Sequence, residues 1–521
     1  AIMKTKKIKD EDKLSLLKTL NSDNHSPLQL SLEDANVYNV LIEEFQLQAR
    51  RSVFEASISE ETGATPLHMF AESQSEEGIK CLLKLLDPAK RKEYLMKTNY
   101  FEKTAIHLVA EKRESGYLPL INELLDLLEN PDDTQYDSES KLAVLELSDD
   151  TNRTVFHNVA MEKEGQAHVL LDSVQCLGSK RLKKLFEKAD DHGKTVFHYA
   201  AEPVIYDESD KHMSKEGVRY KNKKNSKELL ALSSALACDD LTNILRIRDE
   251  SKKTALHYAV DSCLDAVKHL TEQEDKSAKV HWSLIEEADG NGDTVFHIAA
   301  ENQALDIIEY LLQKFPADSK ALVRDSRNKN SETILHKCGW NDKLYGTILN
   351  ILSPGERMEL VRAQDIEGNT VLHQLAISAQ KKGKSIASYD SCRSSMLFLL
   401  QSLNGTSEIN TILNEIRNQL GGTVLEYLFD IQEDCFDVLE EVLTMLPLEP
   451  HLLVALGIDS LAQADPSKLT PHQRYALMKL LPKDSEDHTT LIDQIRASDV
   501  VHYEELKKKI KGGGMYYDLL S

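Results

Sequence analysis

The sequence predicts an all-α solenoid, in which about ten helical units of roughly 40 residues each stack side by side. The first observation behind this prediction is the tetrapeptide Thr-x-x-His, which recurs eight times along the 521 residues. The second is a column of Asp, Asn or Glu five residues before each threonine. The third is an alanine six residues after six of the threonines. Several columns that coincide indicate a true internal repeat.

The tetrapeptide sets the length of the repeat. Its successive threonines are separated by 39, 50, 41, 59, 40, 39 and 37 residues. A unit of about 40 residues with two large insertions accounts for these separations. Weaker copies begin at Ser26 and Thr423, on either side of the array. The complete copies begin at Thr65, Thr104, Thr154, Thr195, Thr254, Thr294, Thr333 and Thr370.

Each column has a physical reason. Asp or Asn followed by Gly favours a tight turn that tolerates positive φ, and glycine stands two residues before the threonine at five copies. Threonine is a good helix N-cap, and Pro66 occupies a first helical position, where its missing N–H costs nothing. The apolar run after each histidine, as in residues 306–312, is typical of a helix.

The segment 289–300, Asp-Gly-Asn-Gly-Asp-Thr-Val-Phe-His-Ile-Ala-Ala, resembles the ankyrin repeat. The resemblance covers about residues 21–446. It implies that each unit has a short β-hairpin finger, a short inner helix and a longer outer helix, and that the units stack into a curved solenoid. It also implies that the histidine bonds the threonine hydroxyl and neighbouring backbone.

The units are longer than the usual ankyrin repeat of about 33 residues. An apolar residue stands ten residues before each threonine, and segments such as 183–190 have the pattern of an extra helical turn. We therefore predict a third short helix leading into each finger. This column comprises Tyr94, Val144, Leu185, Ile244, Leu284, Val323, Leu360 and Leu413.

The eight histidines could suggest a metal site. Their spacing of about 40 residues instead places one in each stacked unit rather than four around one ion. We predict a structural role for them, with no metal and no cofactor. They are His68, His107, His157, His198, His257, His297, His336 and His373.

The chain divides into a solenoid and two ends. We predict an N-terminal helical cap over residues 1–20, the solenoid over 21–446, and a C-terminal helical cap or small module over 447–521. Within the solenoid, the sequence predicts insertions near residues 130–140, 203–226 and 378–394.

Solenoids bind through fingers, inner-helix ends and insertions. Tyr100 and Phe101 occupy a fingertip and Trp340 ends an inner helix, so these aromatic residues are candidate anchors for a partner. Packing against an adjacent unit is the alternative. Glu301 and Asn302 represent the acidic and amide residues that occupy inner-helix ends elsewhere and would complement a basic partner.

The insertion near 203–226 carries the main local charge. Residues 211–227 contain seven Lys or Arg and one acid, a local charge of +6 on a chain of net charge −23. This segment could bind an acidic partner, an anionic lipid headgroup or nucleic acid, or it could be a solvated loop. Its candidate binding residues are Lys211, Arg219, Lys221, Lys223 and Lys224.

Composition excludes several classes of function. The net charge of −23 argues against a general nucleic-acid binder, which needs basic faces. The chain has no apolar run long enough to span a membrane and no Cys-x-x-Cys pair among its seven cysteines, so we expect a cytoplasmic protein with reduced thiols. Protease, hydrolase, phosphate-loop and kinase motifs are missing.

The sequence therefore predicts a non-catalytic, monomeric scaffold that binds a protein through its concave surface. It also looks like the ankyrin-type effectors that intracellular bacteria secrete into host cytoplasm. The alternatives are an enzyme or a lipid-surface adaptor, whose active part is the C-terminal module, the basic insertion or a region outside this sequence.

Overall fold

A computed structural model describes most of the repeat region, in two compact units that divide at residues 290 and 291. The predicted C-terminal module and the basic insertion lie outside the described residues. The residues that the structure describes are 9–17, single positions between 27 and 45, 62–73, 75–85, 88–111, 118–126, 128, 134–161, 167–174, 177–203, 226–272, 284–380, 386–403, 409 and 411–429.

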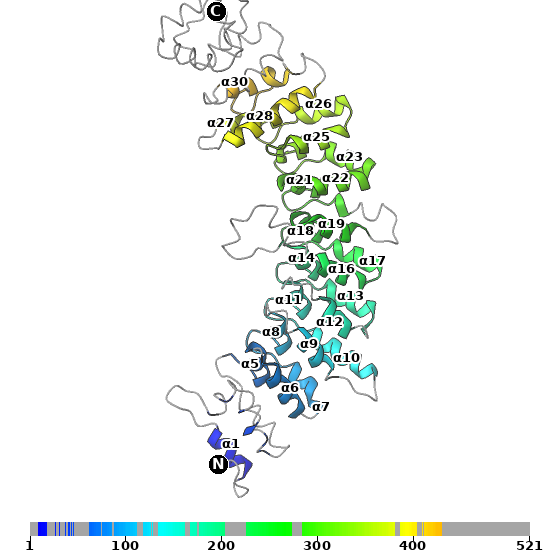
Figure 1. The fold of residues 1–521 in the computed structure, drawn as a ribbon, viewed down its shortest axis with the longest axis vertical. Coiled ribbons are helices and arrows are strands. Elements are labelled where there is room, and N and C mark those ends of the chain that lie inside the picture. The colour runs from blue at the N-terminus through cyan, green and yellow to red at the C-terminus, as the bar shows by residue number, and fades with distance from the viewer. Residues whose placement is uncertain are drawn as a thin grey trace, which may run out of the picture. The chain divides into compact units, whose positions relative to one another are not determined.

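Three rows of helices build the first compact unit, Ala1–Gly290 (Figure 1). The inner helices are α5 (Pro66–Glu72), α8 (Ala105–Ala110), α11 (Val155–Met161), α14 (Val196–Ala201) and α18 (Ala255–Ser262). The outer helices are α6 (Glu76–Leu85), α9 (Leu118–Asp126), α12 (Ala167–Ser173), α16 (Ser226–Ser234) and α19 (Leu264–Thr271). The third row comprises α7 (Pro88–Leu95), α10 (Thr134–Leu145), α13 (Ser179–Glu187) and α17 (Cys238–Leu245).

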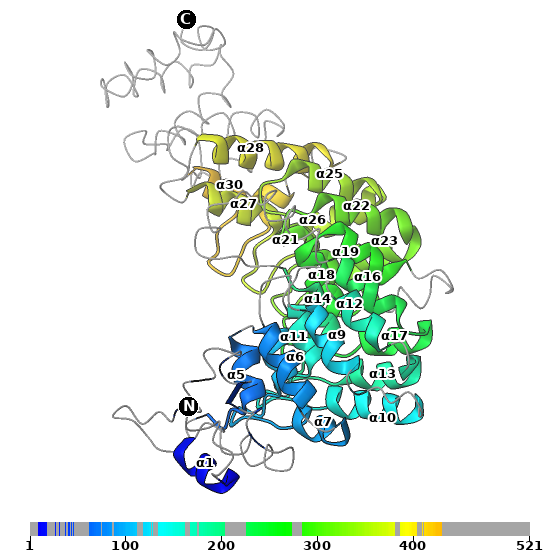
Figure 2. The same ribbon diagram turned by 60° about the horizontal axis from the view of Figure 1, so that its bottom comes forward.

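The second compact unit, Asn291–Ser521, repeats this plan (Figure 2). Its inner helices are α21 (Val295–Glu301), α24 (Ile334–Lys337), α27 (Val371–Gln380) and α30 (Val424–Phe429). Its outer helices are α22 (Leu305–Lys314), α25 (Asp342–Asn350) and α28 (Ile386–Gln401). The third row comprises α23 (Pro316–Asp325), α26 (Pro354–Arg362) and the π-helix η3 (Thr411–Glu415).

In each unit, inner helices pack on inner helices and outer helices on outer helices of the next repeat. The third helix that the sequence predicts is confirmed, and all eight residues of its apolar column are buried. Their burial extends the core beyond the two helices of an ordinary repeat, because the third helices also pack on one another, as α13 does on α17.

Helix also occupies the described parts of two predicted insertions. Near 130–140, α10 begins at Thr134, and near 378–394, α27 ends at Gln380 and α28 begins at Ile386. Pro203 and Ser226 are the described residues at the edges of the insertion near 203–226. Within the predicted N-terminal cap, α1 (Asp10–Leu17) is helical.

The fingers are tight turns, and the predicted β-hairpins are not confirmed, since the described residues contain no named strand. In the finger of Asp149, the backbone N–H of Asp149 donates to the carbonyl of Arg153 at 2.9 Å. The carboxylate Oδ1 of Asp149 accepts from the backbone N–H groups of Thr151 and Arg153 at 2.9 Å. One side chain thus closes the turn, and pairing is limited to isolated antiparallel bridges between Ser148 and Thr154 and between Arg417 and Thr423.

The predicted glycine column has a clear conformational cause. Every described residue at this position, two before the threonine, has positive φ, whether it is glycine or not. The φ angle is +81° at Gly292 and +59° at Ser331, in neighbouring fingers of the second unit. A residue with a side chain is strained in this backbone conformation, so glycine is favoured there. The other residues found at this position lower the stability of the fold.

The histidines couple each inner helix to its own start, and five of them also couple it to the next finger. At all eight copies the histidine Nδ1 lies 2.7–2.9 Å from the threonine Oγ1 and accepts the threonine backbone N–H. The opposite nitrogen carries the proton, and in five of the copies it bonds a carbonyl of the next finger, as from His68 Nε2 to Lys103 O at 2.9 Å. The same bond joins His198, His297, His336 and His373 to Lys253, Glu332, Asn369 and Gly422. The predicted structural role is confirmed.

This bonding requires neutral imidazoles. Burial lowers the pKa of seven of the eight histidines, and for His107 and His157 it lowers the pKa to about 4. Protonation would place a buried charge beside a backbone N–H that has lost its acceptor.

Acid is therefore expected to destabilise the fold. A histidine with a folded pKa below its unfolded value of about 6.5 stabilises the protein fully above that pH, and the contribution is lost as the pH falls toward the folded pKa. His107 and His157 should each contribute about 2 kcal/mol less at pH 5 than at pH 7.5. Urea unfolding at the two pH values measures this. His107→Gln should reduce the pH dependence, because glutamine does not titrate. A flat unfolding free energy would contradict the prediction.

A matched pair of substitutions tests the positive-φ column. Gly292→Ala should lower the free energy of unfolding by about 2 kcal/mol, because alanine is strained at this φ and its Cβ would lie 2.9 Å from the backbone N of Lys329. Ser331→Gly should leave that free energy within about 0.5 kcal/mol or raise it, since relief of strain offsets the entropy of glycine. Equal effects of the two changes would refute the conformational explanation.

Candidate interaction surface

The fingers of each compact unit form a ladder of backbone hydrogen bonds. In every finger that the structure describes from Asn99 onward, the residue that follows the turn-closing Asp or Asn donates its N–H to a carbonyl of the preceding finger. In the first unit these bonds run from Tyr100 to Thr62, Asp150 to Phe101, Asp191 to Thr151, Glu250 to His192 and Gly290 to Ser251, at 2.7–3.1 Å. In the second they run from Lys329 to Asn291, Ile366 to Asn330 and Gln419 to Glu367, at 2.7–2.9 Å. The tips are therefore held in register, and their side chains point outward from a fixed backbone.

The predicted aromatic fingertip is largely solvent-accessible. Tyr100 is 67% exposed and Phe101 is 52% exposed. The Tyr100 ring also covers Gly63 of the preceding finger, where an added Cβ would lie 2.7 Å from the ring. The ring thus packs on the adjacent repeat while most of the pair remains accessible, and the role of the pair as a partner anchor stays a prediction.

Two exposed apolar fingertips of the second unit were not predicted. Leu420 is 87% exposed and Ile366 is 58% exposed, on fingers joined by the bond from Gln419 to Glu367. They occupy the same finger positions as Phe101 and Tyr100, three and four residues before the threonine. Applying the fingertip argument to every copy would have found them.

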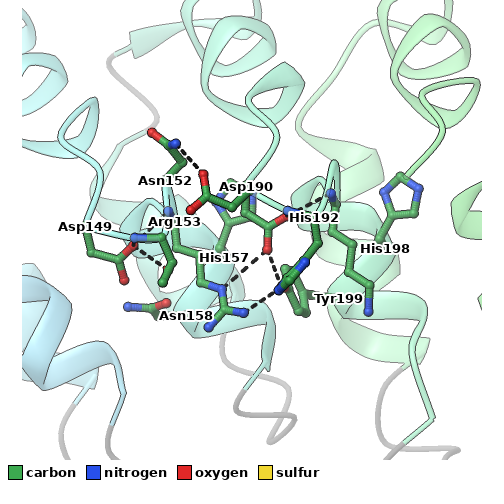
Figure 3. A network of polar contacts seen from close by, with 12 residues as sticks. Asp149, Asn152, Arg153, His157, Asn158, Asp190, His192, His198 and Tyr199 are labelled. Carbon is green, nitrogen blue, oxygen red and sulfur yellow. Dashed lines mark hydrogen bonds and ion pairs between the residues drawn. The ribbon is translucent and has the colours of Figure 1, made fainter. Parts of the chain in front are cut away.

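A buried polar network joins a finger to the next inner helix in the first unit (Figure 3). The Tyr199 hydroxyl, from α14, donates to Asp190 Oδ2 in the finger before it. Arg153, from the preceding finger, donates to the Tyr199 oxygen at 3.0 Å and lies 3.4 Å from the same carboxylate oxygen. Burial raises the pKa of Asp190, but the hydrogen bonds from Tyr199 and from the Lys194 and His192 backbone outweigh it and hold that pKa below its usual value.

The same contact recurs along the stack. In several repeats, the side chain four residues after the threonine is hydrogen-bonded to the turn-closing residue of its own finger. The Oδ1 atom of that turn-closing residue closes the finger, and the other terminal atom of the same side chain holds the inner helix. Tyr258 donates to Asp249 at 2.6 Å, Gln374 donates to Asp365 at 3.0 Å, and Asn418 donates to Tyr427 at 2.9 Å. Burial and these bonds raise the pKa of both Tyr199 and Tyr258.

Cations one residue before the threonine lie over these rings. Arg153 and Lys194 flank Tyr199 at 5.4 and 5.2 Å from the ring centre, and Lys194 and Lys253 flank Tyr258 at 4.8 and 5.5 Å. Lys194 also pairs with Glu202 at 3.1 Å. Sequence reasoning missed this row, although a Lys or Arg precedes four successive threonines of the first unit. Asp190 and Glu202 balance the charges of Arg153 and Lys194, and all three cations lie over rings of the protein itself.

The remaining described candidates lie at inner-helix ends of the second unit. Glu301 is exposed and lies 3.5 Å from Lys337, which also pairs with Glu332 at 3.3 Å. Asn302 and Trp340 are half-buried. Tyr100 and Phe101 belong to the first unit, so the described candidates form two separate groups. The basic candidates, Lys211, Arg219, Lys221, Lys223 and Lys224, lie outside the described residues.

A double-mutant cycle tests the contact between finger and helix. Asp190→Asn keeps the turn-closing oxygen, as the natural Asn328 and Asn418 do, and Tyr199→Phe removes the hydroxyl. The two changes should be coupled by about 1 kcal/mol in the free energy of unfolding, because Asp190→Asn replaces the charge-assisted bond from Tyr199 with a weaker one in which the amide donates, as Asn418 does to Tyr427. The cycle of Asp190→Asn with Tyr310→Phe, in the other unit, should show no coupling. Additive effects in both cycles would show that the charge of Asp190 does not strengthen this bond.

Comparison with known proteins identifies part of this chain. The ankyrin repeat family matches residues 291–321, which include α21 and α22. Leucine-rich repeat serine/threonine-protein kinase 1 of Caenorhabditis elegans is 30% identical over 142 residues, which cover 26% of this chain and 5% of that kinase. No helix among the described residues is long and apolar enough to cross a membrane.

A solved structure offers a weaker likeness. A chain from the complex of the Bd0816 predatory endopeptidase of Bdellovibrio bacteriovorus with immunity protein Bd3460 has a TM-score of 0.29 and 17% identity. The matched region covers 44% of the present chain and 95% of the chain from that complex. Residues 291–321 match the ankyrin repeat family. The same arrangement of finger and helices recurs in the repeats around them.

Proposed function

We propose that this chain is a non-catalytic scaffold that holds a protein partner through its fingertips and inner-helix ends. Ankyrin repeats mediate protein–protein interaction, which supports this class of function. The observation that carries the proposal is the exposed pair Tyr100 and Phe101 on a finger fixed at both edges by backbone bonds to its neighbours. Rigid, accessible aromatic side chains make strong anchors because little conformational entropy is lost on binding.

The chemistry of the described titratable groups also supports a non-catalytic role. Strongly shifted pKa values often mark active sites, but here the shifted groups already serve in bonds that hold the fold. The histidines bond threonines and carbonyls, and the Tyr199 hydroxyl bonds Asp190. Such groups are occupied rather than poised to exchange protons with a substrate.

Two finer predictions from the sequence stay predictions. One is secretion as a bacterial effector into a host cytoplasm. The other is the lipid-surface adaptor, which depends on the segment of charge +6 over residues 211–227. Anionic vesicles test it, and binding that is unaffected by neutralising Lys221, Lys223 and Lys224 would remove it.

Crosslinking and affinity capture test the scaffold. The chain should capture a defined protein, and the variant Tyr100→Ser with Phe101→Ser should capture at least about tenfold less of it, as expected when an aromatic anchor is lost. The matched control is Ile366→Ser with Leu420→Ser, which removes two exposed apolar fingertips of the other unit.

The outcomes separate the possibilities. Retained capture by the control and loss by the aromatic variant supports the anchor. Equal capture by both variants would reject Tyr100 and Phe101 as the anchor, and capture of no protein at low salt would reject the scaffold.

A further inference from the structure

The aromatic fingertip continues into a row of acidic fingertips in the first compact unit. Asp150, Asp191 and Glu250 each stand four residues before a threonine, at the position that Tyr100 occupies in its own finger. All three are exposed. The bond from Asp150 to Phe101 joins this row directly to the aromatic pair, so anchor and charges form one strip.

We propose that this strip is a docking surface for a basic, extended protein segment, which places an apolar side chain on Tyr100 and Phe101 and a Lys or Arg on each acidic fingertip. This inference rests on the proposed scaffold function and names the chemistry of its partner. The apolar pair supplies the anchor, and charge complementarity selects the occupant.

The charges of the strip favour a basic occupant. The tip of each finger comprises the residues two to four before the threonine, which are 100–102, 150–152, 191–193 and 250–252. These four tips carry four carboxylates, those of Glu102, Asp150, Asp191 and Glu250, and one lysine, Lys252, for a net charge of −3. Within the described residues, the recorded partner of the Asp191 side chain is the Asn152 amide at 2.6 Å, and that of Glu250 is His192 at 3.5 Å. Neither partner is a lysine or arginine. The fingertip acids thus differ from the inner cations such as Lys194, whose charge Glu202 already balances.

The register of the fingers sets the spacing that the partner must match. The inner helices α8, α11, α14 and α18 pack directly on one another, and helices in such contact lie about 8–10 Å apart. The fingers are bonded at each step, so their tips repeat at about the same interval. An extended chain in the polyproline II conformation has three residues per turn and rises about 3.1 Å per residue, so every third side chain lies on the same face and three residues span one step. The occupant should therefore carry a basic residue at every third position.

Synthetic peptides test this directly. The probes are two fluorescent 12-residue peptides, one with a tryptophan followed by three arginines at every third position and one with the reverse order. One of them should bind, and grouping the arginines together should weaken its binding about tenfold. Binding should also weaken as the salt concentration rises, since exposed charges contribute.

Variants of the chain assign the binding to the strip. Asp150→Asn with Asp191→Asn and Glu250→Gln should weaken the bound peptide about tenfold, and Tyr100→Ser with Phe101→Ser should do so independently. The charge-matched control neutralises three exposed acids on helices of the other unit, Glu309→Gln, Asp318→Asn and Glu359→Gln, and should leave binding unchanged. Unfolding curves confirm that each variant is folded.

Each remaining outcome would overturn the proposal. Equal weakening by both acidic triples would indicate bulk charge, and equal binding of the grouped peptide would remove the spacing argument. Sedimentation that shows a dimer broken by the aromatic change, together with no peptide binding, would identify a second copy as the occupant. If the chain captures a natural protein, and the variant Asp150→Asn with Asp191→Asn and Glu250→Gln captures it equally well, this docking surface would be rejected. The scaffold function would remain intact.

Discussion

The neutral histidine between consecutive repeats is the interaction on which the rest of the structure depends. Its Nδ1 accepts the threonine N–H that opens the inner helix, and in five repeats its Nε2 donates to a carbonyl of the next finger. One buried side chain therefore fixes both where a helix begins and where the next repeat lies. The burial that makes these bonds strong also lowers the pKa of the ring, so stability and neutrality are linked.

The turn-closing Asp or Asn extends this control to the fingers. Its Oδ1 atom closes the turn, and its other terminal atom is hydrogen-bonded to the inner helix, as Asp190 Oδ2 is to the Tyr199 hydroxyl. The residues three and four before the threonine contribute to the fold mainly through their backbone, although some of their side chains also make contacts, as Thr151 does with Asp149. Their backbone alone forms the ladder, so their side chains can vary from Asp150 to Leu420, and partner selection can reside there.

Much of the fold could be predicted from columns in the sequence. The Thr-x-x-His motif, the positive-φ position and the third helix all have local causes, and the residues that carry them stand at fixed distances from the threonine. The hairpin finger is not confirmed in the described residues, where a single Asp or Asn side chain closes the turn and strand pairing is limited to isolated bridges. At the candidate surface, Tyr100 and Phe101 could be placed by their column. The row of Arg153, Lys194 and Lys253 over tyrosine rings could not, because it joins residues of different repeats.

The sequence by itself determined the repeat, its length and the identity of the buried polar residues, because steric and capping preferences act within a few residues of the chain. Only the tertiary structure decided which charges are balanced within the protein and which face solvent. Lys194 and Asp191 are both charged and three residues apart, yet one pairs with Glu202 while the other stands at an exposed tip beside Asn152. That difference arises from distances between side chains that the stacking of repeats brings together.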